Sequence, residues 1–237
     1  NEGNDINEEL FYYESLGKMY ERVERYKDAM EIWNAMIESV DHCVPAYIHR
    51  QQTAYTIKDA QLVIDDYYNI IRDFPAYSRA YALAARVFLI YKQFNDVKNV
   101  IDNADNSGVE SDYVNWMRCK YLEFTKDREE ESDSEDKTEV LTKKSPKEKE
   151  EDIEKLYRLI DDNIQDENID SDIDEKELPD FYADAGAFLI NLRDENGNRS
   201  RLDDVLPFLE KGFKFDKKNK RLLWLRTDVE EFADRKA

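Results

Sequence analysis

The sequence is poor in the residues that punctuate β-rich or disulfide-bonded folds. Only 6 of its 237 residues are Gly and 5 are Pro, too few for the many tight turns of a β-sandwich or barrel. The two cysteines, Cys43 and Cys119, match no metal-ligand spacing and exclude a disulfide framework in a chain of this size. No apolar run approaches the roughly 18 residues of a transmembrane helix, and the N-terminus does not resemble a signal peptide. This composition favours long helices joined by short turns.

Basic charge is also scarce. Lys and Arg together number 35 against 55 Asp and Glu, which gives a net charge of −20. Nucleic acids and anionic membranes attract proteins through a basic surface, so the sequence predicts neither as a partner. Two thiols in predicted helices, together with the absence of a signal peptide, favour a cytoplasmic location.

A period of 34 residues is the strongest feature that is present. Tyr13, Tyr47 and Tyr81 stand 34 residues apart, and no insertion is needed between residues 10 and 111. Further series with this period are Gly17/Gln51/Ala85, Tyr20/Ala54/Phe88, Tyr26/Ala60/Phe94, Ala29/Val63/Val97 and Trp33/Tyr67/Ile101. Within each copy the apolar residues recur at the 3-and-4 spacing of an amphipathic helix. The predicted helices cover 8–24, 26–40, 44–56, 58–74, 78–91 and 95–104, and their short breaks require antiparallel hairpins.

These residues resemble the tetratricopeptide repeat (TPR) superfamily. The first copy has its aromatic, Leu-Gly and Tyr pattern in Tyr13, Leu16-Gly17 and Tyr20, followed in the second helix by Ala29 and Trp33. The second copy has Pro75 at the closing position, and Gln51 departs from the family by standing in a small-residue place. The resemblance implies an all-α, right-handed α-solenoid of stacked antiparallel helix hairpins, with about five TPR-like units and a C-terminal capping helix.

The later part of the chain follows the pattern less closely. Residues 112–165 predict a degenerate fourth repeat, with a flexible charged insertion at 127–150 and a helix that resumes at Asp152. Residues 178–219 predict a fifth repeat, and 220–237 a capping helix whose outer side is charged, as the end of a solenoid requires. We therefore expect one repeat domain over residues 1–237, with 10–111 as its three regular repeats.

The sequence contains few of the residue patterns that catalysis requires. His42 and His49 are the only histidines, and neither belongs to a Ser/His/Asp or Cys/His signature. The acidic run from Asp170 to Asp174 resembles a calcium loop, but Glu175 and Phe181 stand where an EF-hand needs Gly and Glu. No glycine-rich phosphate motif occurs. We predict that the protein is not an enzyme and has no cofactor and no metal site.

The resemblance also implies where a partner would bind. In TPR proteins the first helix of each hairpin lines a concave groove that binds extended peptides or partner helices. The matching positions predict a binding site at Lys18, Arg22, His49, Gln52, Arg79 and Arg86. The cations among them would form a basic strip that suits a partner with acidic groups. At the five places of the chaperone-tail clamp stand Glu14, Lys18, His49, Arg79 and Leu83; only Arg79 is close to that pattern, so the clamp is disfavoured.

The predicted function is therefore that of a non-catalytic scaffold that binds a peptide or a partner protein. One alternative is the interaction arm of a larger chaperone-linked or regulatory polypeptide, because the chain begins at Asn1 without Met. An alternative of another class is an enzyme with a cleft between its two halves. The sequence leaves the partner and the oligomeric state open.

Overall fold

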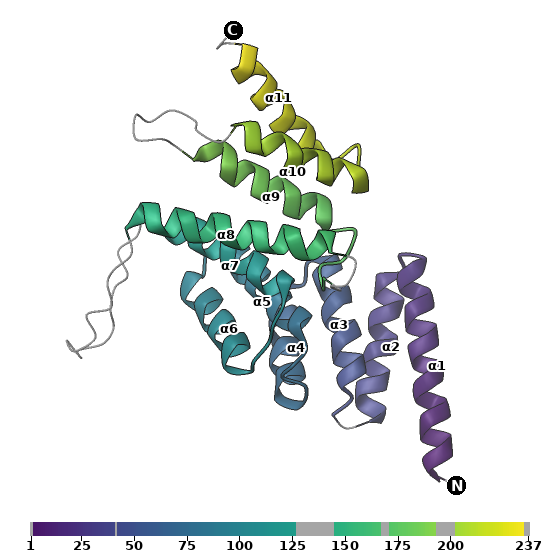
Figure 1. Cartoon of the computed structure of the whole chain (residues 1–237). Coiled ribbons are helices and arrows are strands. Elements are labelled where there is room, and N and C mark those ends of the chain that lie inside the picture. The colour runs from purple at the N-terminus through teal and green to yellow at the C-terminus, as the bar shows by residue number, and fades with distance from the viewer. Residues whose placement is uncertain (1, 41, 127–144, 167–170, 193–201, 235–237) are drawn as a thin grey trace, which may run out of the picture. The chain divides into compact units, whose positions relative to one another are not determined.

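The described part of the protein is entirely helical. The structure, a computed structural model, describes residues 2–40, 42–126, 145–166, 171–192 and 202–234. In these residues it has helices and turns and no strand (Figure 1). The helices are α1 (Glu2–Arg22), α2 (Tyr26–Ser39), α3 (Val44–Ile57), α4 (Ala60–Asp73), α5 (Ser78–Ile90), α6 (Phe94–Asn106), α7 (Asp112–Thr125), α8 (Pro146–Gln165), α9 (Leu178–Asn191), α10 (Leu202–Phe215) and α11 (Lys220–Asp234). Neighbouring helices pair, so the predicted all-α hairpin fold is confirmed.

The chain divides into two compact units. Unit 1 comprises residues 1–117 and unit 2 residues 118–237, with the boundary inside α7. Each unit is described by itself below. The single repeat domain expected over residues 1–237 stays a prediction.

The 34-residue series form the core of unit 1. Trp33 and Tyr67, which share one place in the period, are both fully buried. Gly17 lies against Trp33, and a Cβ atom at Gly17 would stand 2.3 Å from the indole ring. Helices α1 and α2 therefore approach each other closely at the small residue, as the period predicts, and the aromatic ring fills the space beside it.

Gln51 occupies the corresponding small-residue place in the second copy. Its side chain is fully buried, and its amide group donates hydrogen bonds to the carbonyl oxygens of Val63 (3.1 Å) and Ala80 (3.4 Å). These acceptors belong to α4 and α5, so one side chain of α3 joins three helices. A buried amide that meets acceptors in this way avoids much of the cost of losing water.

The turns inside the three hairpins of unit 1 are nearly identical. Glu24, Lys58 and Lys92 stand 34 residues apart and have φ values of 58°, 66° and 58°, in the left-handed region. In each turn, the N–H of the following residue donates a hydrogen bond of 2.9 Å to a carbonyl oxygen near the end of the helix. The pairs are Arg25 N with Tyr20 O, Asp59 N with Ala54 O, and Gln93 N with Phe88 O. This left-handed ending satisfies helix carbonyls that would otherwise lack partners.

In unit 2, α8 begins earlier than the sequence predicted. The expected start was Asp152, whereas the helix begins at Pro146. Ser145 caps it: the Ser145 hydroxyl accepts from the Glu148 N–H, and the Glu148 carboxylate accepts from the Ser145 N–H. This capping box, with Pro in the first turn, starts a helix in a charged segment. Residues 127–144 of the predicted insertion lie outside the described residues.

Helices α9, α10 and α11 pack against one another in unit 2. Almost every residue of α9 is buried, and Gly186 and Gly212 stand where side chains of neighbouring helices come closest. The exposed side of the last helix carries charged residues, as predicted, but also two apolar ones: Leu223 is 45% exposed and Trp224 is 67% exposed. Apolar residues recur at nearly every place along α11, so its sequence alone did not show which of them would be left uncovered.

Candidate functional site

The six predicted binding residues lie on the first helices of the three hairpins of unit 1. Lys18 and Arg22 belong to α1, His49 and Gln52 to α3, and Arg79 and Arg86 to α5. Side-chain contacts link the three helices, as described below. We call these six residues, together with Glu14 and Glu21, the first-helix face.

A carboxylate joins α1 to its neighbours. Glu21 Oε1 accepts from Trp33 Nε1 at 3.1 Å and from the Thr53 hydroxyl at 2.8 Å. His49 stacks on Trp33 with ring centroids 4.5 Å apart, and its Nδ1 lies 3.8 Å from Glu21 Oε2. Lys18 forms an ion pair with Glu14 one turn earlier. The structure thus brings Lys18 and His49 together, but beside two carboxylates, so this end of the face carries mixed charge.

His49 is not a cation near neutral pH. Burial of the imidazole lowers the pKa of His49, and Lys18 adds to this effect, while Glu21 and Glu14 oppose it. Burial disfavours the charged form of a group because it removes the water that stabilises the charge. Burial therefore favours the neutral ring of His49, and the role of His49 in partner binding stays a prediction.

Aromatic rings accompany the polar residues of α3 and α5. Gln52 donates a hydrogen bond to the hydroxyl of Tyr77 at 2.9 Å, and Arg79 lies over the ring of Tyr113, 5.7 Å from its centroid. Arg79 also contributes to the electrostatic environment of Tyr77, so these side chains are neighbours. The structure brings Gln52 and Arg79 together as predicted neighbours on one face.

Arg86 lies between two aromatic rings. Its guanidinium carbon is 5.5 Å from the centroid of Tyr55 in α3 and 5.4 Å from that of Trp116 in α7. It also donates a hydrogen bond to the hydroxyl of Tyr113 at 3.1 Å. Such contacts fix the plane of the guanidinium and contribute about 0.5–2 kcal/mol each. Arg86 of α5 is thus held by side chains of two other helices, α3 and α7.

Arg22 stands apart from the other five residues. It is exposed, and it has no hydrogen bond or ion pair with another described side chain. Sequence reasoning missed Tyr77, Tyr113 and Trp116 as members of the face. Tyr113 and Trp116 follow the third regular repeat, where the register loosens, and Tyr77 precedes the first helical residue of α5. A search for aromatic residues near each predicted arginine could have found them.

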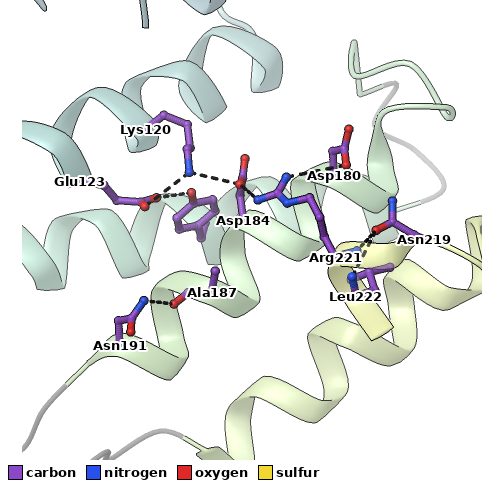
Figure 2. Close-up of polar contacts among 10 residues, drawn as sticks. Lys120, Glu123, Asp180, Asp184, Ala187, Asn191, Asn219, Arg221 and Leu222 are labelled. Carbon is purple, nitrogen blue, oxygen red and sulfur yellow. Dashed lines mark hydrogen bonds and ion pairs between the residues drawn. The ribbon is translucent and has the colours of Figure 1, made fainter. Parts of the chain in front are cut away.

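The first helices of unit 2 carry a different kind of cluster, shown in Figure 2. Asp184 of α9, which is only 6% exposed, accepts from Lys120 of α7 at 3.1 Å and from Arg221 of α11. Lys120 also lies 3.6 Å from Glu123, and Arg221 lies 3.7 Å from Asp180. One buried carboxylate therefore ties three helices together.

Burial sets the protonation behaviour around Asp184. It raises the pKa of Glu123, although Lys120 and the hydroxyl of Tyr157, which donates to Glu123, oppose this. Burial works against the charge on Lys120, but Asp184 and Glu123 outweigh it, so the pKa of Lys120 is raised. Lys120 stays charged, and its charge is used within the fold rather than offered to a ligand.

A hollow lies beside this cluster on α9 and α11. It has a volume of about 240 Å³ and is lined by Ala187, Lys220, Arg221, Trp224 and Leu225. It combines an apolar floor with the exposed indole of Trp224. It is a second place, within unit 2, that could receive a small apolar group.

The described residues show little of the chemistry that catalysis or metal binding requires. No group of three or more His, Cys, Asp or Glu among them is arranged to hold a metal ion. Both thiols are buried, and burial raises the pKa of Cys43 and of Cys119, which disfavours the reactive thiolate. None of the described helices is long and apolar enough to cross a membrane.

Comparison with known proteins identifies the fold. No protein-family model matches the sequence, and the search of curated proteins finds no match.

Solved structures do match. A tetratricopeptide repeat protein from Parabacteroides merdae has a TM-score of 0.60 at 10% identity, over 94% of this chain and 72% of that one. A thermophilic TPR protein from Thermus thermophilus has a TM-score of 0.58 at 12% identity, over 94% and 97% of the two chains. YrrB, a TPR protein with an unusual peptide-binding site, has a TM-score of 0.50 at 10% identity, over 95% and 96%. The chain therefore has the fold of TPR proteins.

Proposed function

We propose that the chain is a non-catalytic protein–protein interaction scaffold that binds a peptide or a partner protein on the first-helix face of unit 1. The observation that carries this proposal is the placement of Arg86 between Tyr55 and Trp116. A guanidinium whose orientation is fixed before binding loses little conformational entropy when a partner arrives. The hairpin stack thus presents a preorganised donor group.

The α3–α5 part of the face suits a partner with acidic groups. Arg79 and Arg86 can each donate two parallel hydrogen bonds to a carboxylate, and the amide of Gln52 can contact a peptide backbone. The neighbouring rings of Tyr55 and Trp116 can pack against apolar parts of the same segment. Lys18 and neutral His49 would contact the partner at the other end, where Glu14 and Glu21 disfavour further acidic groups.

The TPR fold supports this proposal, and so does the description of YrrB as a peptide-binding TPR protein. If the chain is instead the interaction arm of a larger chaperone-linked or regulatory polypeptide, it would use the same face. Only the polypeptide to which the face is joined would differ. For the enzyme alternative, the buried thiols of Cys43 and Cys119 offer no activated nucleophile.

Selection of peptides from a phage-displayed random library would test the proposal. The library is panned on the wild-type chain after depletion on the Arg79→Glu/Arg86→Glu variant, and selected peptides are measured by fluorescence anisotropy. We expect acidic peptides whose affinity falls at least about tenfold in the double variant, since each tenfold is about 1.4 kcal/mol. Affinity should also fall as salt rises, because salt screens exposed charges.

The matched control is Lys27→Glu/Lys98→Glu, which makes the same change of charge on the second helices α2 and α6. This variant should bind the selected peptides as the wild type does. Equal loss in both double variants would reduce the effect to net charge, and equal binding by all three proteins would refute the site. Turnover in hydrolase or transferase screens would refute the non-catalytic part of the proposal.

A further inference from the structure

A second surface of unit 2 is open and has the character of a docking groove. It lies between α10 and α11, has a volume of about 430 Å³, and is lined by Glu210, Phe213, Lys214, Lys217, Leu223 and Arg226. Phe213 and Leu223 form an apolar floor, and Leu223 is 45% exposed. The two helices that form it are labelled in Figure 1.

The rim of this groove is basic in a strongly acidic protein. Its lining includes three basic residues, Lys214, Lys217 and Arg226, and one acidic residue, Glu210, whereas the whole chain has a net charge of −20. Lys214 and Lys217 form no ion pair with any described residue, and Arg226 pairs with Glu230 of its own helix at 2.8 Å. An acidic segment would therefore meet favourable charge here and unfavourable charge over most of the remaining surface.

Unit 1 contains a helix pair, α2 and α3, that corresponds to α10 and α11. Adding 176 to a residue number aligns the start of α2 at Tyr26 with the start of α10 at Leu202. The same shift aligns the start of α3 at Val44 with the start of α11 at Lys220. The shift also carries buried residues onto buried residues: Ala29, Trp33 and Met36 onto Val205, Leu209 and Gly212. Groove residues Glu210, Phe213, Leu223 and Arg226 then correspond to Asn34, Ile37, Tyr47 and Arg50.

Arg50, which corresponds to Arg226, links α3 to α2 and to α4. It donates to Asn34 of α2 at 2.7 Å and, through two bonds of 2.9 and 2.7 Å, to Asp66 of α4. The Arg50 side chain is 15% exposed beneath these contacts, whereas that of Arg226 is 57% exposed. The face of α4 that is buried consists of Val63, Asp66, Tyr67 and Ile70. Arg50 thus joins α2 and α3 to the one acid on the buried face of α4, whose Val63 and Tyr67 pack on residues of α3 and α5.

We propose that the groove between α10 and α11 binds an amphipathic helix of a partner protein, whose apolar stripe packs on Phe213 and Leu223 and whose acidic residue pairs with Arg226. The helix resembles α4 in its acid, since Asp66 pairs with Arg50, the residue that corresponds to Arg226. Its apolar residues follow the spacing of Val63, Tyr67 and Ile70, and its acid follows that of Asp66. This is recognition of a helix in a groove, on a surface separate from the first-helix face of unit 1.

The experiment uses the chain's own α4 as the probe. A fluorescein-labelled peptide of residues 58–74 is titrated with the full chain, and anisotropy gives the dissociation constant at low salt. We expect saturable binding with a gain of peptide helicity by circular dichroism. Arg226→Asp should weaken binding about tenfold or more, because it places two carboxylates together. The peptide with Asp66→Arg should recover affinity for the Arg226→Asp chain and lose it for the wild type.

Two further variants separate the groove from general effects. Leu223→Asp should also abolish binding, because it puts a charge in the apolar floor. Lys218→Glu makes a comparable change of charge in the turn outside the groove, and should alter the affinity less than about twofold. Both residues are exposed, so folding is checked by thermal melting.

Three outcomes overturn the proposal. One is the absence of saturable binding at about 1 mM peptide, which is the weak limit of specific recognition. Another is failure of the reversed-charge pair to recover affinity. The third is a concentration-dependent oligomer in sedimentation that Leu223→Asp dissociates, since a second copy of this chain would then occupy the groove.

Discussion

The first helices of the two units hold their charged side chains in different ways. In unit 1, Arg86 lies between the rings of Tyr55 and Trp116 and donates to the Tyr113 hydroxyl. In unit 2, Lys120 and Arg221 converge on the buried carboxylate of Asp184. The first arrangement orients a cation on a surface, and the second joins three helices. The difference is consistent with the binding face that we propose for unit 1, whereas the charges of Lys120, Arg221 and Asp184 are used within the fold of unit 2.

The two units also differ in what fills the space between helices. In the first hairpin of unit 1, the aromatic ring of Trp33 packs against the small residue Gly17. Unit 2 places aliphatic side chains at the glycines: Leu209 meets Gly186, and Leu222 meets Gly212. Flat rings fill their space with little freedom to adjust, while leucines can change rotamer. Four experiments test these differences, from the largest expected effect to the smallest.

Removal of the tryptophan ring should damage unit 1 most. Trp33→Ala should lower the free energy of unfolding by about 3–5 kcal/mol, because it leaves a cavity between α1, α2 and α3. Urea denaturation followed by far-ultraviolet circular dichroism measures the change. The control is Trp224→Ala in unit 2, whose exposed indole should change stability by less than about 0.5 kcal/mol. Similar losses in the two variants would contradict the assignment of Trp33 to the core.

The carboxylate hub of unit 2 should come next. Asp184→Asn should lower the free energy of unfolding by about 1–3 kcal/mol, because Lys120 and Arg221 lose a shared charged acceptor in a buried place. Asp180→Asn is the control: Asp180 lies one turn away, is partly exposed and pairs with Arg221 at 3.7 Å. Surface pairs of this kind contribute about 0–1 kcal/mol. Equal melting temperatures for both variants would show that the cluster does not stabilise unit 2.

The sequence predicted the elements of unit 1 because one physical demand recurs there. Each copy must place an apolar stripe on each of two helices. The same apolar positions therefore recur at a fixed spacing, as in the series Tyr13, Tyr47 and Tyr81. The left-handed turns at Glu24, Lys58 and Lys92 were not predictable in the same way. They carry no Gly, so their conformation is imposed by the hydrogen bonds of the helix end rather than by residue type.

The candidate sites were predictable in part. Helical spacing placed Gln52, Arg79 and Arg86 on one face, but it could not show that rings from α3 and α7 would orient Arg86. The pair of Lys120 and Asp184 is 64 residues apart in the chain, so no local pattern contains it. A local signal did exist, since Asp184 is an acid within the otherwise apolar run of α9. The early start of α8 was also readable from Ser145 and Glu148, three residues apart.

Adding a methyl group at two glycines compares the packing of the units directly. At Gly17 a Cβ atom would lie 2.3 Å from the rigid ring of Trp33, so Gly17→Ala should destabilise by about 1–3 kcal/mol. At Gly186 the nearest atom is a methyl of Leu209 at 2.9 Å, which a rotamer change can move. Gly186→Ala should therefore be close to neutral, because the helix also gains about 0.5–1 kcal/mol from Ala. Thermal melting of both variants measures the two effects. Equal destabilisation would mean that the side chain of Leu209 is as rigid as the indole of Trp33.

Acid should affect unit 1 through His49, with the smallest effect of the four. The pKa of His49 is lowered in the folded chain, chiefly by burial, so the unfolded chain binds more protons as the pH falls through the ordinary histidine value of 6.5. The stability that neutral His49 contributes is therefore present above pH 6.5 and decreases below it. His49→Phe keeps a ring on Trp33 but removes the titrating group. The fall in unfolding free energy between pH 7.5 and 5.5 should thus be smaller in His49→Phe than in the wild type. An identical fall in both proteins would mean that the carboxylates of Glu14 and Glu21 offset the burial of the imidazole, and His49 would then regain its place as a cation of the binding face.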